Sequence, residues 1–157
     1  MGQLNLELAT ARDTERLGAH FADAIRKSDA RQLLVLLSGN LGAGKTTFAR
    51  GLVRRLGHVG PVPSPTYTLV EPYTAGGLRV NHIDLYRLGD KAELEFIGWR
   101  ELLDDICLVE WPERAGALVA GADVEVHLRL DGAGRRLSAT AGTAMGRELL
   151  QFVADAA

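Results

Sequence analysis

Residues 33–47 read LLVLLSGNLGAGKTT, and this stretch decides the fold. Five consecutive apolar residues at 33–37 predict a buried strand, and Ser38 leads from it into a segment that fits G-x-x-x-x-G-K-[ST]. In such a phosphate-binding loop, or P-loop, glycines allow a tight turn that brings backbone N–H groups close to phosphate oxygens. Lys45 can reach the β- and γ-phosphates, and the Thr46 hydroxyl can bind Mg²⁺. A helix that begins near Lys45 adds partial positive charge at its N-terminus.

The motif is specific enough to predict nucleotide binding by itself. From the residue frequencies of this chain, its four fixed positions co-occur by chance with a probability of ~0.003, and the required strand and helix on either side lower this further. We therefore expect ATP or a related nucleotide with Mg²⁺, and a catalytic role for Lys45. The loop residues expected to contact the nucleotide are Asn40, Leu41, Gly42, Ala43, Gly44, Lys45, Thr46 and Thr47.

Length and composition limit the remaining possibilities. The chain has 157 residues, 46% of them hydrophobic, so we expect residues 1–157 to form a single domain with a proper core. A net charge of −2 gives no overall basic footprint for nucleic acid. The single cysteine, Cys107, lies in an apolar run and is expected to be a small buried hydrophobe. Without a signal peptide or an apolar stretch of about 18 residues, we expect a soluble, cytoplasmic protein with no membrane partner.

The N-terminal segment predicts a strand followed by a helix. Residues 4–8 alternate apolar and polar side chains, which is typical of a half-exposed strand. Asp13 or Thr14 can cap a helix that carries Leu17 and Phe21 on one face. A capped turn beside a P-loop can also contact adenine, and Thr14 is the candidate for this contact; capping alone is the alternative.

The segment that follows the P-loop helix is rich in proline and hydroxyl groups. After a helix over residues 47–56 that Gly57 closes, residues 60–67 read GPVPSPTY. Prolines at alternating positions remove donors and fix an extended conformation, so this segment is predicted to be a loop. Switch-type NTPases place a γ-phosphate sensor at such a position, which makes Ser64 and Thr66 candidates. An ordinary connecting loop is the alternative.

The next two strands deliver an acidic side chain to the same region. Residues 68–73 and 78–85 predict an antiparallel hairpin, and the second strand ends in HIDLYR. Strand alternation places His82, Asp84 and Tyr86 on one face. Asp84 can bind Mg²⁺ through water or orient the attacking water, or it can serve only as a turn residue. His82 alone is predicted to be a packed, hydrogen-bonded residue rather than a metal ligand.

A second acidic side chain follows a run of buried residues. Residues 90–105 predict two short helices broken near Gly98, and residues 106–111 read ICLVEW. This is the pattern of a Walker B strand, which delivers a carboxylate to Mg²⁺ at its C-terminal end, so Glu110 is expected to hold the metal or act as the base. A plain strand exit is the alternative. Glu113, just after Pro112, is expected near the nucleotide.

The C-terminal part predicts a second hairpin and a closing helix. Residues 123–130 and 136–141 alternate strongly and are joined by the turn at 131–134; a helix is expected over 144–154. The elements together predict an α/β fold: a single P-loop NTPase domain with three layers, whose mixed sheet has a parallel centre and antiparallel edge hairpins.

The order and spacing of four segments resemble a known family. These segments read GNLGAGKTTFARGL at 39–52, SPTYTLVEPY at 64–73, HIDLYRL at 82–88 and ICLVEWPE at 106–113. Together they resemble the bacterial TsaE (YjeE) family over about residues 14–136, nearly the whole chain. The resemblance implies an ATPase needed to form N6-threonylcarbamoyladenosine, the modified base next to the anticodon in tRNAs that read codons beginning with A.

The resemblance also implies partners and roles for particular residues. The partners are TsaB and TsaD; TsaD transfers the threonylcarbamoyl group, ATP hydrolysis drives or resets the complex, and contact with tRNA is left open. Gly42, Gly44, Lys45 and Thr46 match the family's phosphate and Mg²⁺ positions, and Ser64 and Thr66 its switch-like segment. Asp84 matches its acidic position, and Glu110 with Trp111 its E-W pair, in which Glu110 is on the metal.

Two other functions compete with this interpretation. A small-molecule kinase usually needs a lid with several arginines; the nearest set here is Arg114, Arg135 and Arg136, and Arg135 is also a candidate nucleotide-binding residue. A GTP-dependent switch would carry a base-reading N-K-x-D motif, and this sequence has none.

Overall fold

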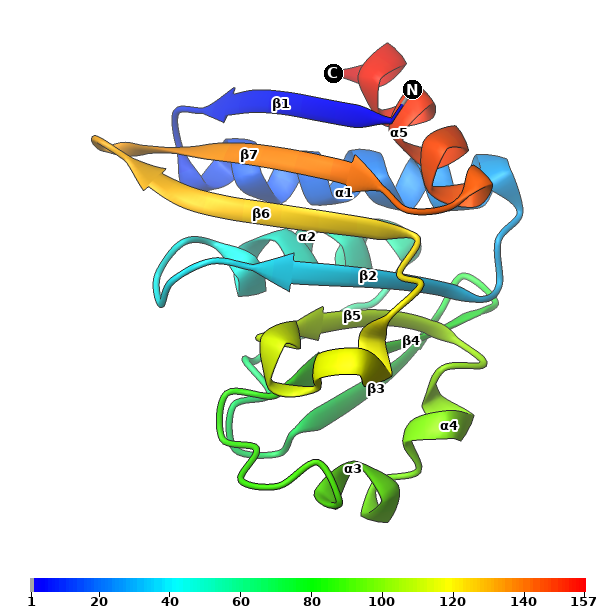
Figure 1. The fold of residues 1–157 in the computed structure, drawn as a ribbon. Coiled ribbons are helices and arrows are strands. Elements are labelled where there is room, and N and C mark those ends of the chain that lie inside the picture. The colour runs from blue at the N-terminus through cyan, green and yellow to red at the C-terminus, as the bar shows by residue number, and fades with distance from the viewer. Residues whose placement is uncertain (1) are drawn as a thin grey trace.

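A seven-stranded mixed sheet forms the centre of the computed structural model, which describes residues 2–157 (Figure 1). The strand order is β1-β7-β6-β2-β5-β4-β3. The strands are β1 Gln3–Leu8, β2 Leu33–Ser38, β3 Val70–Ala75, β4 Leu78–Asp84, β5 Ile106–Glu110, β6 Val124–Asp131 and β7 Gly134–Ala141. The predicted strands are thus all present, and the first hairpin strand begins at Val70 rather than at residue 68.

The directions of the strands confirm the predicted parallel centre and antiparallel edges. Strand β2 pairs in parallel with β5 on one side and β6 on the other, and β4 pairs in parallel with β5. The hairpins β3–β4 and β6–β7 are antiparallel, and β1 adds to β7 in the same way. Register places Glu110 between Leu37 and Asp84, so the ends of three parallel strands meet at one edge of the sheet.

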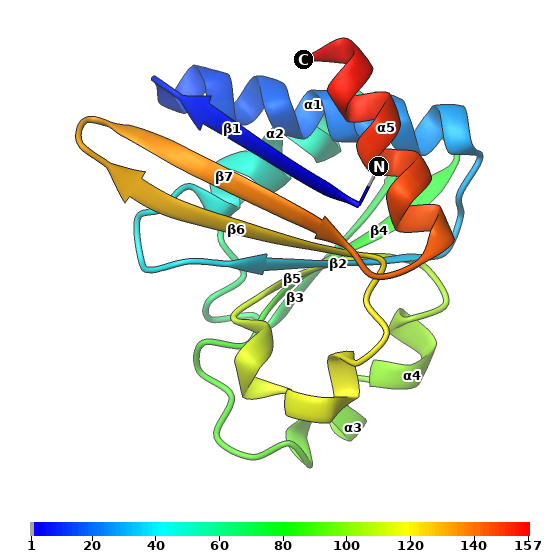
Figure 2. The same ribbon diagram turned by 45° about the horizontal axis from the view of Figure 1, so that its top comes forward.

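Helices cover both faces of the sheet, which confirms the three layers (Figures 1 and 2). The long helices α1, α2 and α5 lie on one face, and the short elements lie on the other. Their bounds are α1 Ala11–Ser28, α2 Lys45–Leu56, α3 Glu93–Phe96, α4 Trp99–Leu102, α5 Ala144–Ala156 and the 3₁₀ helices η1 Pro112–Arg114 and η2 Gly116–Val119. The predicted break at Gly98 separates α3 from α4.

The apolar run at the start of the P-loop motif is buried on both faces because strand side chains alternate. Leu33, Val35 and Leu37 pack into the cluster beneath α1, α2 and α5, whereas Leu36 packs into the cluster beneath the short helices. Cys107 belongs to the second cluster, as predicted, and burial raises the pKa of its thiol to about 12. Within residues 2–157, no helix is both long enough and apolar enough to span a membrane.

Two glycines allow α1 to lie directly against the P-loop helix α2. A Cβ at Gly18 would lie 2.2 Å from the carbonyl oxygen of Phe48, and one at Gly51 would lie 2.0 Å from that of Glu15. No real side chain tolerates such distances, so the close approach of the two helices requires glycine at both positions. The approach brings the first turns of α1 beside the phosphate-binding loop.

The beginning of α1 corrects one prediction. Thr10, rather than Asp13 or Thr14, is the N-cap: its Oγ1 accepts a hydrogen bond from the Asp13 N–H at 3.2 Å. The Asp13 carboxylate accepts in return from the Thr10 N–H at 3.1 Å, which completes a capping box. Thr14 lies one turn inside the helix and is buried. Its hydroxyl is therefore free of the capping role.

Candidate active site

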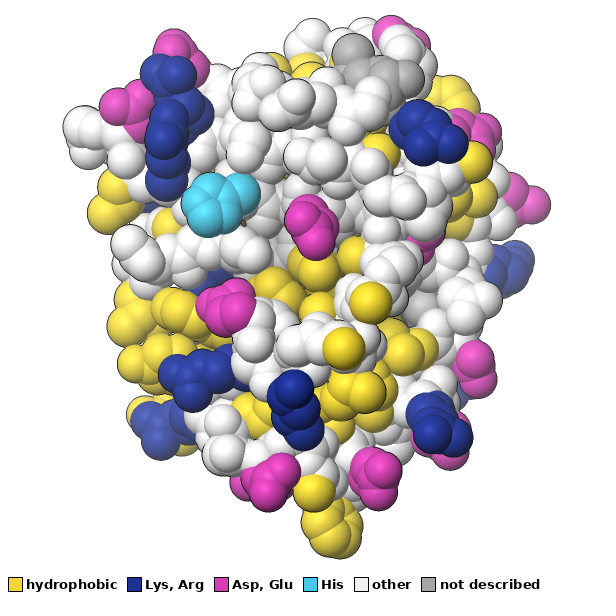
Figure 3. Space-filling model, viewed as in Figure 1, with side chains coloured by type: hydrophobic (Ala, Val, Ile, Leu, Met, Phe, Trp, Pro, Cys, Tyr) yellow, Lys and Arg dark blue, Asp and Glu magenta, His cyan; other side chains and the backbone are white. Residues whose placement is uncertain are grey.

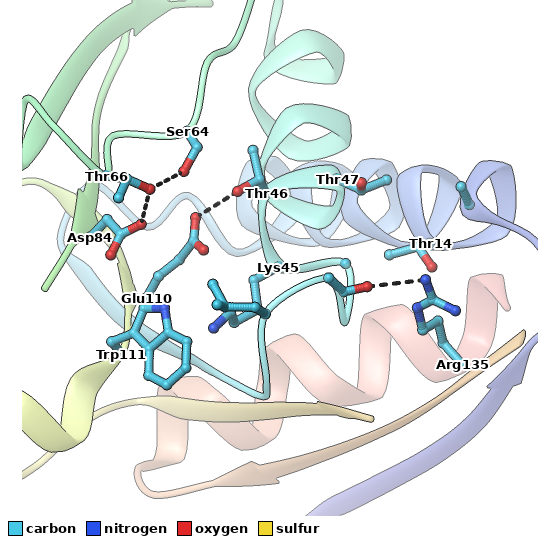
Figure 4. Close-up of a pocket in the computed structure, with 14 residues that line it drawn as sticks. Thr14, Lys45, Thr46, Thr47, Ser64, Thr66, Asp84, Glu110, Trp111 and Arg135 are labelled. Carbon is cyan, nitrogen blue, oxygen red and sulfur yellow. Dashed lines mark hydrogen bonds between the residues drawn. The ribbon is translucent and has the colours of Figure 1, made fainter. Parts of the chain in front are cut away.

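A cavity of about 290 Å³ lies where the P-loop meets the ends of β4 and β5 (Figure 4). Ligands of open α/β sheets bind at this edge, outside the carboxyl ends of the strands. Most of the residues predicted from the sequence line this cavity together. The lining residues are Ala11, Thr14, Leu41, Gly42, Gly44, Lys45, Thr46, Thr47, Ser64, Thr66, Asp84, Glu110, Trp111 and Arg135.

The P-loop owes its shape to glycines with left-handed backbone geometry. Gly42 and Gly44 have φ angles of 79° and 107°, which side chains rarely adopt. Gly44 is the N-cap residue of α2 and offers no side chain to the first N–H groups of that helix. These N–H groups and the helix dipole therefore point at whatever anion the loop holds.

Lys45 is buried in the loop and lies on an aromatic ring. Its Nζ donates a hydrogen bond to the carbonyl oxygen of Gly39 at 2.5 Å and lies 3.6 Å from the centroid of the Trp111 ring. Burial lowers the pKa of the Lys45 ammonium; the Glu110 carboxylate, followed by Asp84 and Glu113, acts in the opposite direction. The cation is thus held among negative groups at the place where phosphate charge is expected.

Trp111 holds an uncommon backbone conformation immediately after β5. Its φ angle of 58° and ψ angle of 50° are left-handed, a region that bulky residues adopt at a cost of about 1–3 kcal/mol. The turn directs the indole over Lys45, and the Tyr86 ring packs against the indole with the two ring centroids 5.0 Å apart. The strained turn fixes the aromatic wall of the cavity.

The P-loop and the Walker B strand are joined by a direct hydrogen bond. The Thr46 hydroxyl donates to Oε2 of Glu110 at 3.1 Å, and the same oxygen lies 2.6 Å from Nε2 of His82 (Figure 4 draws the Thr46 contact). His82 is hydrogen-bonded and packed, as its sequence context predicts. Thr46 and Glu110 therefore present a hydroxyl and a carboxylate to the same point in the cavity.

A second chain of hydrogen bonds ties the proline-rich loop to β4. The Ser64 and Thr66 hydroxyls lie 2.8 Å apart, and the Thr66 hydroxyl donates to Oδ2 of Asp84 at 3.0 Å. The Tyr86 N–H donates to the other oxygen of Asp84 at 2.8 Å. Both Asp84 oxygens thus have partners in the chain, and Asp84 connects the loop to the end of the strand (Figure 4).

The opposite wall of the cavity comes from α1 and β7. The Arg135 guanidinium donates from Nε to the carbonyl oxygen of Ala43 at 3.1 Å and from Nη2 to that of Gly42 at 3.0 Å. The Thr14 hydroxyl lies on the same side of the loop and has no hydrogen-bond partner within residues 2–157, although it is buried. A buried hydroxyl without a partner is expected to be satisfied by a ligand or by water.

Three predicted residues lie outside the cavity lining, and one lining residue was missed. Ala43 is buried within the loop, whereas Asn40 and Glu113 line a neighbouring cavity of about 490 Å³. The missed residue, Ala11, follows the N-cap; the Thr-x-x-Asp capping box at residues 10–13 would have placed the first turn of α1 there. The loop therefore separates two cavities, and Trp111 borders both.

The donors at the cavity fit a magnesium ion. Mg²⁺ prefers oxygen ligands and is usually held by one or two protein groups, water and substrate phosphates rather than by a complete protein cage. Thr46 and Glu110 supply a hydroxyl and a carboxylate, and Asp84 adds a second carboxylate nearby. Across the described part of the chain, no group of three His, Cys, Asp or Glu side chains could hold a metal ion.

The family model for the threonylcarbamoyl adenosine biosynthesis protein TsaE matches residues 8–137. The chain belongs to the TsaE family. A tRNA threonylcarbamoyladenosine biosynthesis protein TsaE from Haemophilus influenzae is 42% identical over 138 residues, covering 86% of this chain and 87% of that protein. A TsaE protein from Rickettsia felis is 31% identical over 150 residues, covering 94% and 85% of the two chains.

A solved structure agrees with this assignment. The crystal structure of Bacillus subtilis YdiB superposes with a TM-score of 0.80 at 25% sequence identity and covers 98% of this chain and 95% of that one. The TsaE family and the P-loop fold together imply a nucleotide-binding protein of tRNA threonylcarbamoyladenosine biosynthesis.

Proposed function

We propose that this TsaE-family chain binds and hydrolyses ATP with Mg²⁺ to drive or reset a tRNA-threonylcarbamoylating complex that contains TsaB and TsaD. The observation that carries the proposal is the hydrogen bond between Thr46 of the P-loop and Glu110 of β5, because it joins the phosphate-binding and carboxylate halves of a hydrolytic site. The relatives' names supply the pathway. The chain itself does not transfer the threonylcarbamoyl group.

Each polar group at the cavity has a role in this proposal. The N–H groups of Gly42 and Gly44 and the Lys45 ammonium bind phosphate oxygens, and Thr46 and Glu110 hold Mg²⁺. The ion supplies charge neutralisation at the phosphates when it is bound. The Oε1 of Glu110, which has no hydrogen-bond partner within residues 2–157, can reach the metal ion as a ligand or the attacking water as a base.

The proline-rich loop provides the link from nucleotide to partner. Ser64 and Thr66 line the cavity, and the next residue, Tyr67, is 82% exposed, with the Arg87 guanidinium 4.2 Å from its ring centroid. Leu41 at the tip of the P-loop is 65% exposed as well. Exposed apolar side chains beside a nucleotide site are suited to contact partners whose binding depends on the nucleotide.

The hydrolysis rate of the chain alone is expected to be low. The arginine nearest the cavity, Arg135, is engaged by P-loop carbonyl oxygens, so it is not free to approach a γ-phosphate. An arginine supplied by a partner typically adds about 10³-fold or more to the rate of such sites. Net charge and the mixed charges on the face in Figure 3 favour an action on tRNA through the partners rather than by direct contact.

The same geometry argues against the kinase alternative. Arg136 pairs with Glu7 and Asp131 at the surface, and Arg114 lies 5.8 Å from the Tyr86 ring centroid, so the three candidate lid arginines do not converge on the cavity. Transfer of labelled γ-phosphate to a metabolite in the absence of partners would revive that alternative. Protection by GTP equal to that by ATP would favour the GTP switch.

The proposal is tested by nucleotide-dependent capture and by turnover. Immobilised chain is expected to retain TsaB and TsaD in the presence of ATP and Mg²⁺ and to lose them without nucleotide. Hydrolysis should rise when both partners are added, and Lys45→Ala should abolish it together with the capture. Equal retention of TsaB and TsaD with and without ATP would contradict the proposal. A hydrolysis rate that the partners leave unchanged would contradict it as well.

A further inference from the structure

His82 is a polar ring in an apolar layer. It lies on β4 with Val80 on the same face of its own strand and Leu108 beside it on β5, and both neighbours belong to the core cluster under α1 and α2. Its exposed fraction is 0%. Burying a polar group costs free energy unless a hydrogen bond compensates for the lost contact with water. An apolar side chain would therefore be more stable at this position if the ring made no functional hydrogen bond.

The His82 ring makes such a hydrogen bond to Glu110. Its Nε2 lies 2.6 Å from Oε2 of Glu110. An ionised carboxylate can only accept, so Nε2 carries the proton and Nδ1 holds a lone pair. Nδ1 is buried and has no partner within residues 2–157, so a proton on Nδ1 would have no acceptor there.

The two donors to Glu110 share one of its oxygens. The His82 ring and the Thr46 hydroxyl both contact Oε2, whereas no hydrogen bond to Oε1 occurs within the described part of the chain. The side chain of Glu110 lines the cavity, and His82 does not. The arrangement therefore fixes the carboxylate from behind and leaves Oε1 for a ligand.

Of the two donors, His82 is the one that lies outside the cavity, and within residues 2–157 its ring is hydrogen-bonded only to Glu110. In the ATPase mechanism proposed above, on which this inference rests, the oxygen of the Thr46 hydroxyl would also be a ligand of Mg²⁺, so Thr46 serves the metal as well as Glu110. We propose that His82 is a positioning residue, whose Nε2–H holds the Glu110 carboxylate with Oε1 toward the nucleotide and its metal ion. Such partners behind a metal-binding carboxylate typically contribute about 10- to 100-fold to metal affinity or activity.

Two amide variants provide a matched test. In His82→Gln the amide nitrogen can occupy the place of Nε2 and donate to Glu110, whereas in His82→Asn, one methylene shorter, it lies near the place of Nδ1. We expect His82→Gln to keep kcat for ATP hydrolysis, measured with both partners, within about threefold, and His82→Asn to lose about 10- to 100-fold. KM for ATP should change little in either, because the P-loop contacts are intact.

Thermal unfolding of both variants controls for folding. Equal melting temperatures with unequal kcat would support positioning, and so would a weaker Mg²⁺ dependence of ATP binding in His82→Asn alone. Equal kcat in the two variants, or a change confined to KM, would overturn the proposal.

Nitrogen-15 spectra of the ring test the geometry without any turnover. In the parent chain we expect a protonated Nε2 and an unprotonated Nδ1, and Glu110→Gln should shift the Nε2 signal while Glu113→Gln leaves it unchanged. A proton on Nδ1 with none on Nε2 would overturn the proposal. A parent chain that binds but never hydrolyses ATP would instead refute the ATPase function, and the spectra would still decide whether His82 holds Glu110.

Discussion

The Nζ of Lys45 lies 3.6 Å from the centroid of the Trp111 ring and is hydrogen-bonded to the carbonyl oxygen of Gly39. Both partners belong to the chain itself, so a phosphate bound in the loop must compete with them for the ammonium. A cation over an indole face gains about 0.5–2 kcal/mol, whereas charge-assisted bonds to phosphate are stronger. Nucleotide binding is therefore expected to draw Lys45 away from Trp111.

This displacement should be visible in tryptophan fluorescence. In a Trp99→Phe background, where Trp111 is the remaining indole, saturating ATP with Mg²⁺ should change the emission, because an ammonium leaves its ring face. Trp111→Phe is the matched variant and should show no nucleotide-dependent change. An unchanged Trp111 signal, together with binding demonstrated by calorimetry, would show that Lys45 stays on the ring.

Replacing Lys45 should stabilise the fold while it removes binding. Burial lowers the pKa of Lys45 from its ordinary 10.5, so the folded state binds this proton less tightly than the unfolded state does. The buried charge therefore destabilises the folded state by its full amount at any pH below the lowered pKa. This destabilisation decreases as the pH rises from the lowered pKa to 10.5. Lys45→Met is therefore expected to raise the free energy of unfolding at pH 7 by about 1 kcal/mol, as is common for active-site charges.

Urea unfolding of parent and variant over a pH series measures this effect. The advantage of Lys45→Met should shrink as pH rises toward 10.5, and Lys91→Met, which alters a lysine outside the site, should show no such trend. A parent that is more stable than Lys45→Met at pH 7 would contradict the expected sign.

Two adjacent arginines on β7 differ in their contacts: Arg135 is hydrogen-bonded to the P-loop, whereas Arg136 forms ion pairs at the surface. Arg135 donates to the carbonyl oxygens of Gly42 and Ala43, so Arg135→Ala should loosen the loop and raise Kd for ATP about tenfold, the value of a lost charge-assisted bond. Arg136→Ala removes only exposed ion pairs and should change Kd less than about twofold. Equal effects in calorimetric titrations would show that Arg135 does not brace the loop.

The sequence was sufficient for features that depend on local pattern. The run at 33–37 predicted β2, and the ICLVE segment predicted β5 with its acid at the cavity edge, because burial and strand periodicity act over a few residues. A parallel centre of the sheet was also predicted, although the order in which β2, β5 and β4 pair was not. Hence Thr46, Asp84 and Glu110 were expected at one place, and they line the same cavity.

Features that depend on tertiary placement were not accessible in this way. Arg135 was a candidate nucleotide-binding residue, but its hydrogen bonds to P-loop carbonyl oxygens depend on β7 pairing with β6 next to β2, which no local pattern encodes. Asn40 and Glu113 face the neighbouring cavity for the same reason: the direction of a loop side chain is set by what packs around it.

The contact between α1 and α2 predicts a large effect of a single methyl group. Gly51→Ala raises helix propensity, yet its Cβ would lie 2.0 Å from the carbonyl oxygen of Glu15, so the helices must separate. We expect a loss of about 1–3 kcal/mol in unfolding free energy, as in other overpacked interfaces, with weaker ATP binding because Thr14 moves with α1. Arg50→Ala, one residue earlier in α2, is the control and should unfold like the parent in urea.

The two acids at the cavity are expected to differ in role. Both Asp84 oxygens accept hydrogen bonds, from Thr66 and from the Tyr86 N–H, whereas Glu110 retains an oxygen without a partner within residues 2–157. Glu110→Gln should therefore lower kcat about 10²- to 10⁴-fold, as the loss of a general base does, and preserve ATP binding. Asp84→Asn should cost less, because Asp84 acts through the loop.

Thr66→Val decides whether Asp84 acts through the loop. It removes the hydroxyl that donates to Asp84 at 3.0 Å and leaves the carboxylate intact, so it should reproduce the modest loss of Asp84→Asn. Both variants should also expose residues 60–67 to faster proteolysis, since the loop loses its tie to β4. If Asp84→Asn abolished hydrolysis while Thr66→Val hydrolysed ATP at the parent rate, Asp84 rather than Glu110 would act directly on the metal or the attacking water.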